Sequence, residues 1–189
     1  MSPAFTVAII HYHLRGGGVT QVIRSASSAL RERGIRHVIL SGEAMVGGGD
    51  LPVNVIPGLA YRTAPGGPAA DEVLAEMKAA AGPGPVVWHF HNHSLGRNPV
   101  TAEIVALLAL AGEAMVLQLH DLAENGRPMN YPLIAAARCL YPHSPRIRLA
   151  FLNARDQRHF TAAGLPESRA RVVPNAVDPP AVKACRTSE

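Results

Sequence analysis

Cysteine and lysine are scarce in this sequence of 189 residues, and each scarcity excludes a class of protein. Cys139 and Cys185 are the only cysteines and lie far apart, which excludes a disulfide framework and indicates a reducing compartment. Lysine occurs only at Lys78 and Lys183, so the net charge of +4 comes from scattered arginines. Because the sequence has no basic run with interleaved aromatic residues, we expect no binding to nucleic acid.

Long hydrophobic runs are also missing. The longest, Val105–Ala111, is too short to span a bilayer. Met1–Ile10 lacks the basic segment and hydrophobic core of a signal peptide. We therefore predict a cytoplasmic protein. The excess of arginine is compatible with anionic ligands, or with weak peripheral contact at the inner face of the membrane.

Short β-rich runs alternate with helical periodicity along the chain. Strands are expected at Thr6–His11, His37–Leu40, Val53–Ile56, Val86–Phe90, Ala114–Leu119, Arg148–Leu152 and Arg171–Val173. Helices are expected from Val19, over Asp71–Ala81, from Pro99, over Pro132–Leu140 and after Asn153. This alternation predicts an α/β, Rossmann-like domain over residues 1–177: an open parallel sheet of about six or seven strands with helices on both faces. Residues 178–189 are expected to form a linker or tail.

Ligands of open parallel sheets bind beyond the carboxyl ends of the strands, so the loops that follow strands are the places to search. The first such loop holds Gly16, Gly17 and Gly18 before a predicted helix. Glycines let a ligand approach the backbone, and the N–H groups of a helix start favour a phosphate. The loop matches neither GxGxxG nor a P-loop, so a simple tight turn remains an alternative.

Histidines mark the other two loops. Strand alternation places His89, His91 and His93 on one side of the strand, if the strand extends that far. Such a group can form part of a metal site, or it can contribute packing and hydrogen bonds to a substrate. The third loop begins with His120 and Asp121, and this carboxylate could orient the imidazole or receive a proton.

In order along almost the whole chain, these segments resemble the N-terminal domain of a GT-B glycosyltransferase of the retaining family 4 type. The matching features are the first strand before Gly16-Gly-Gly-Val19, then His89-Phe-His-Asn92, His120-Asp121 and Phe151-Leu-Asn-Ala-Arg-Asp156. The most specific feature is Val172-Val-Pro-Asn-Ala-Val-Asp178, which resembles the family's V-I-P-N-G-V-D stretch at the junction between its two domains. Ala176 stands where that family usually has glycine.

The resemblance implies an acceptor-binding domain that transfers a hexosyl group from a nucleotide sugar, such as a UDP- or GDP-sugar, without a bound metal. It places Gly16, Gly17 and Gly18 near the donor diphosphate and His120 beside the donor sugar. The donor-binding domain is expected to be absent from this chain and to come from a missing domain or a partner chain. The predicted catalytic residues are His120 and Asp121, and the predicted acceptor or phosphate cleft comprises Arg15, His91, Asn92 and Arg127.

Two other classes of function remain open. One is a metal-dependent hydrolase that uses His89, His91 and His120. The other is a non-catalytic module that recognises a glycan or a partner, or that forms a homodimer through the loops at the carboxyl ends of the strands.

Overall fold

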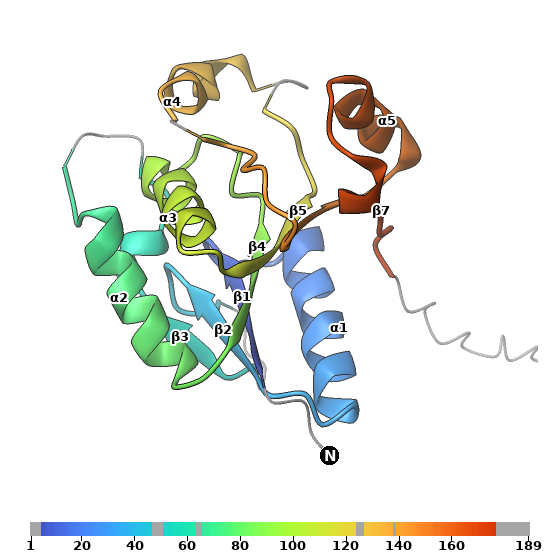
Figure 1. Cartoon of the computed structure of the whole chain (residues 1–189). Coiled ribbons are helices and arrows are strands. Elements are labelled where there is room, and N and C mark those ends of the chain that lie inside the picture. Colours follow the sequence, from blue (N-terminus) through green and yellow to red (C-terminus); the bar gives the residue numbers. More distant parts are fainter. Residues whose placement is uncertain (1–4, 47–50, 63–65, 124–126, 138, 177–189) are drawn as a thin grey trace, which may run out of the picture.

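Seven parallel strands form one sheet in this computed structural model, which describes residues 5–46, 51–62, 66–123, 127–137 and 139–176 (Figure 1). The strands are β1 Thr6–His11, β2 His37–Ser41, β3 Val53–Val55, β4 Val86–His91, β5 Ala114–Leu119, β6 Ile147–Phe151 and β7 Ala170–Val172. The helices are α1 Gly18–Glu32, α2 Ala70–Ala81, α3 Pro99–Leu110, α4 Tyr131–Ala135 and α5 Ala154–Ala162. Short 3-10 turns occupy Pro57–Leu59, Pro128–Asn130 and Glu167–Arg169. The predicted fold class is confirmed.

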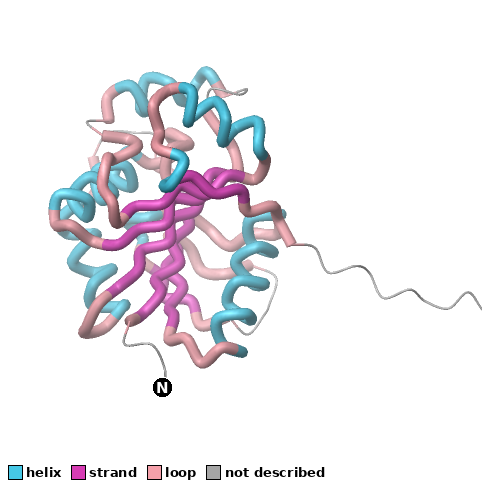
Figure 2. Tube along the Cα trace, turned by 45° about the vertical axis from the view of Figure 1, so that its right-hand side comes forward, coloured by secondary structure: helices cyan, strands magenta, loops and turns pink. Residues whose placement is uncertain are grey.

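Helices cover both faces of the sheet, as the nearly continuous apolar strands predict (Figure 2). On one face α1 buries Ile23 against Val7, Ile9 and Ile39. The larger core lies on the other face, where α2 and α3 pack over the central strands and Phe160 of α5 packs near β6.

The order of the strands, β3-β2-β1-β4-β5-β6-β7, fixes where a ligand can approach. The chain runs outward from β1 to β3 and then crosses back to β4 on the other side of β1. At such a topological switch point the loops on the two sides diverge and leave a crevice. The loops after β1, β4 and β5 meet there, and we call this region the carboxyl edge.

Local sequence signals explain most helix boundaries. The Asn98 side chain accepts a hydrogen bond from the backbone of Val100 at 3.0 Å, and Pro99 takes the first position of α3. The Asn153 side chain likewise caps α5 by accepting from Asp156 N at 2.9 Å. Gly34, at φ 64°, provides the left-handed residue after α1 that an L side chain adopts at a cost.

The helix predicted over Pro132–Leu140 is wrong in length, since α4 ends at Ala135. Helix propensity favours continuation through the alanines that follow, but a tertiary contact opposes it. His93 Nε2 lies 2.7 Å from the Leu140 carbonyl, in hydrogen-bonding distance, and this contact draws the chain back toward the end of β4. Residues 177–189, which include the predicted tail, lie outside the described residues.

Candidate functional site at the carboxyl edge

Asn92, the first residue after β4, organises the carboxyl edge. Its side-chain Oδ1 accepts hydrogen bonds from the backbone N–H of His120 at 2.7 Å and of Asp121 at 3.1 Å. The backbone N–H of Asn92 donates to Gln118 O at 2.9 Å, so the main chain and the side chain of Asn92 both connect the end of β4 to β5 and the loop after it. Asn92 has φ 59°, a left-handed conformation that asparagine tolerates better than most residues. Asn92 is only 2% exposed, so it positions the backbone of His120 and Asp121 and offers little surface to a ligand in the cleft.

The imidazoles of His91 and His120 form a hydrogen-bonded pair. His91 Nδ1 and His120 Nε2 lie 2.8 Å apart, and the rings stack with their centroids 5.0 Å apart. One of these nitrogens therefore carries the hydrogen while the other accepts it. His91 is therefore the hydrogen-bond partner of the His120 ring, and the proposed roles of Asp121 as orienting group or proton acceptor stay predictions.

Burial keeps the histidine group, by which we mean His11, His89, His91 and His120, neutral at pH 7. It lowers the pKa of His11 and of His89 to about 4, and the pKa of His91 falls well below its ordinary value. Burial also lowers the pKa of His120, although the carboxylate of Asp121 opposes this effect. The group therefore offers neutral donors and acceptors to a ligand and not positive charge.

The placement of His93 beside His89 and His91 is wrong. Strand β4 ends at His91, and the left-handed turn at Asn92 breaks the alternation. The ring of His93 is buried in the protein, where its Nε2 contacts Leu140 O and its plane lies nearly perpendicular to the ring of Tyr141. His89 and His91 do share one side, with ring centroids 4.4 Å apart.

Residues that the sequence did not single out connect β1 to this group. The hydroxyl of Tyr12, which is 2% exposed, donates to the carbonyls of Asn92 at 2.9 Å and His93 at 3.2 Å. His11 Nδ1 lies 3.2 Å from His91 O, and the His11 ring contacts His13. The run His11-Tyr-His13 at the end of a predicted strand could have indicated these residues, but only tertiary contacts show what their side chains bind.

The glycine loop lies on the same edge and leaves open space around its backbone. A Cβ added at Gly16, Gly17 or Gly18 would meet no atom within 4 Å, and all three residues are exposed. Helix α1 begins at Gly18 with no side-chain cap and no acidic residue in its first turn. Its first N–H groups and their partial positive charge are thus available to an anion.

The predicted polar residues divide into two sets. His91, Asn92, His120 and Asp121 are in direct contact, and Arg127 joins them through a 3.7 Å ion pair with Asp121. Arg15 instead forms a bidentate pair with Glu43, at 3.0 and 2.8 Å.

A metal centre finds no support in the part of the chain that the structure describes, where no group of three or more His, Cys, Asp or Glu residues is placed to hold an ion. His89 Nε2 faces Gln118 Oε1 at 2.9 Å, while His91 and His120 direct nitrogens at each other. The hydrolase hypothesis needs these nitrogens to converge on one point.

Among the described helices, none is long and apolar enough to cross a membrane.

Comparison with known proteins finds similarities in sequence and in structure, while no family model matches the chain. Over 95 residues, or 49% of this chain, it is 30% identical to the mannosylglucosyl-3-phosphoglycerate synthase of Petrotoga mobilis. The structure is similar to the crystal structure of Anabaena HepE in complex with UDP-glucose, with a TM-score of 0.56 and 14% identity over 92% of this chain. The chain spans 19% of the synthase and 44% of HepE. The likeness to HepE supports the Rossmann-like α/β fold.

Proposed function

We propose that this chain is the acceptor-side domain of a sugar-nucleotide-dependent glycosyltransferase of the GT-B, family 4-like type. The observation that carries the proposal is the meeting of three loops at the topological switch point: the glycine loop, Asn92 and His120. The named relatives support it, since one is a mannosylglucosyl-3-phosphoglycerate synthase and the other was solved with UDP-glucose.

His120 contacts the transferred hexosyl group in this proposal. A neutral imidazole held by His91 can accept from or donate to a sugar hydroxyl, which suits a polar but uncharged ligand. Asp121 lies beside it as a hydrogen-bond acceptor, and Arg127 lies 3.7 Å from that carboxylate.

The exposed N–H groups at Gly17 and Gly18 approach the diphosphate of a UDP- or GDP-sugar. A bound metal is not required. Arg15, which is exposed, can contact an anionic group once it leaves its partner Glu43, because ion pairs near the surface are weak. The remaining donor contacts come from a second domain or partner chain, and transfer takes place in the cytoplasm.

A transfer assay on the protein expressed from its complete reading frame tests the assignment. UDP- and GDP-hexoses are supplied with a mixture of candidate acceptors, and release of the nucleoside diphosphate is measured. His120→Ala is expected to lower the rate at least about tenfold, the scale of one good hydrogen bond in the transition state. His37→Ala is the matched control, because His37 lies at the amino end of β2. An unchanged rate in His120→Ala would refute its role, and sugar binding without transfer would favour the glycan-binding module.

A further inference from the structure

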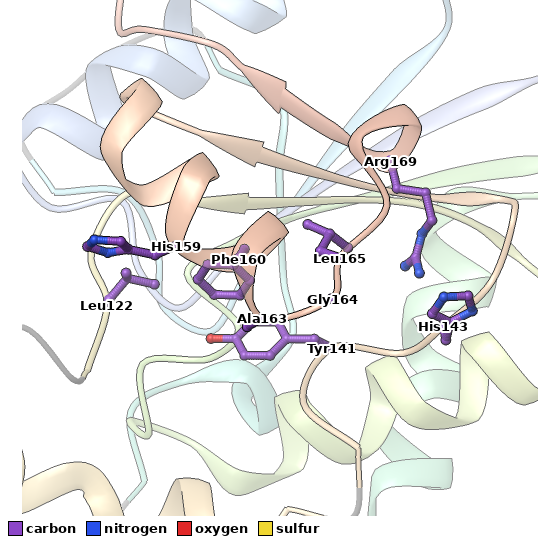
Figure 3. Close-up of a pocket in the computed structure, with 9 residues that line it drawn as sticks. All are labelled: Leu122, Tyr141, His143, His159, Phe160, Ala163, Gly164, Leu165 and Arg169. Carbon is purple, nitrogen blue, oxygen red and sulfur yellow. The ribbon is translucent and has the colours of Figure 1, made fainter.

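A cavity lies on the face of the sheet that carries α5. Its volume is about 500 Å³. Figure 3 shows the side chains around it, which come from the loop after β5, the segment before β6, and α5 with the turns that follow. The lining residues are Leu122, Tyr141, His143, His159, Phe160, Ala163, Gly164, Leu165 and Arg169.

The body of this cavity is apolar. The rings of Phe160 and Tyr141 lie nearly perpendicular to each other with their centroids 4.9 Å apart, and Leu122 and Leu165 complete the wall. These four side chains are only half-buried, although they pack against the main core. The fold therefore leaves aromatic and aliphatic surface around an open space, and an apolar ligand would bury it.

One end of the cavity is positively charged. Arg169 is 5% exposed, and it donates from Nε to Ile147 O at 3.1 Å and from Nη2 to Pro142 O at 2.6 Å. None of the ion pairs found among the described residues includes Arg169, and no Asp or Glu lines the cavity. A buried cation without a carboxylate partner is unfavourable, so an anion placed beside it would gain stabilisation. His143 lies near the guanidinium in Figure 3.

We propose that this cavity binds an amphipathic anion, in which a carboxylate or phosphate is joined to an apolar body. The anionic group lies at Arg169 and the apolar body lies between Tyr141 and Phe160. Leu122 directly follows His120 and Asp121, so the other end of the cavity lies next to the proposed reaction centre. This inference rests on the proposed function, under which the occupant is the apolar, anionic part of the acceptor.

Titration calorimetry on the 189-residue chain tests the cavity with four probes: octanoate, octyl phosphate, octanol and inorganic phosphate. Octanoate and octyl phosphate are expected to bind with one-to-one stoichiometry, and the tighter of the two identifies the anionic group. Octanol is expected to bind at least about tenfold more weakly, because it lacks the charge-assisted hydrogen bond to Arg169. Inorganic phosphate is expected not to bind detectably. Equal binding of octanol and octanoate would overturn the proposal.

Two variants locate the site. Arg169→Met is expected to reduce octanoate binding to the level of octanol, whereas the exposed Arg171→Met is the matched control. Because Arg169→Met also removes two hydrogen bonds to carbonyls and can unfold the chain, Ala163→Trp provides an independent test by filling the cavity. Leu110→Trp adds the same ring to an 86% exposed position on α3. Octanoate binding that survives Ala163→Trp would refute the site.

The same probes separate this proposal from the proposed function. Octanoate binding without any detectable sugar transfer would leave the cavity established and refute the transferase. Transfer to an acceptor, with no binding of octanoate or octyl phosphate to the chain, would support the transferase and refute the cavity.

Discussion

Replacing the buried side chain of Asn92 should destabilise the protein strongly, because two backbone N–H groups depend on it. In Asn92→Ala the N–H groups of His120 and Asp121 lose their shared acceptor. Each lost bond at a partly buried donor costs about 1–2 kcal/mol, and alanine in the left-handed region adds about 1 kcal/mol. The free energy of unfolding should therefore fall by about 4 kcal/mol.

Urea unfolding followed by the fluorescence of Trp88 measures this change, since Trp88 is 1% exposed and is the only tryptophan in the sequence. Asn92→Gly is the informative comparison, because glycine accepts the left-handed backbone but still removes the hydrogen bonds. It should be at least as stable as Asn92→Ala, whereas glycine is less stable than alanine at ordinary positions. A loss below about 1 kcal/mol in Asn92→Ala would show that the side chain does not hold the edge.

Two further changes probe the histidines and the glycine loop. His11, His89 and His93 have folded pKa values of about 4, below the ordinary 6.5, so between pH 6.5 and 4 the unfolded chain binds more protons than the folded one. The free energy of unfolding in urea should therefore fall as the pH decreases through this window, by up to about 1.4 kcal/mol per pH unit for each histidine. A free energy of unfolding that does not change from pH 7 to pH 5 would contradict the burial of these histidines. Gly17→Ala should leave thermal stability almost unchanged, because its Cβ meets no atom within 4 Å, yet should weaken binding of a nucleotide sugar measured by calorimetry; equal binding would exclude contact between the loop and the diphosphate.

The strands and helix caps could be predicted because their signals are local. The runs Thr6–His11 and Ala114–Leu119 are strands with the expected bounds, and Asn98 and Asn153 cap the expected helices. In each case the deciding interactions involve residues a few positions apart.

The site was predicted only as a set of loops, because its internal geometry depends on contacts between distant residues. The alternation rule placed His93 with His91, but the turn at Asn92 ended the strand between them. The pairing of His91 with His120 joins residues 29 positions apart. The cavity beside Arg169 combines three segments of the chain, and no periodicity in any of them indicates it.

The electrostatics of the carboxyl edge explain why the proposal assigns it to the sugar and acceptor side of a transferase. Its histidines are kept neutral by burial, and Arg15 and Arg127 are already paired with Glu43 and Asp121. Neutral imidazoles and backbone N–H groups recognise hydroxyl groups well, but they neutralise a departing diphosphate less effectively than free cations do. Under the proposed function, an edge with this balance of groups orients the sugar and the acceptor, and a second domain or partner chain supplies most of the charge stabilisation of the leaving group.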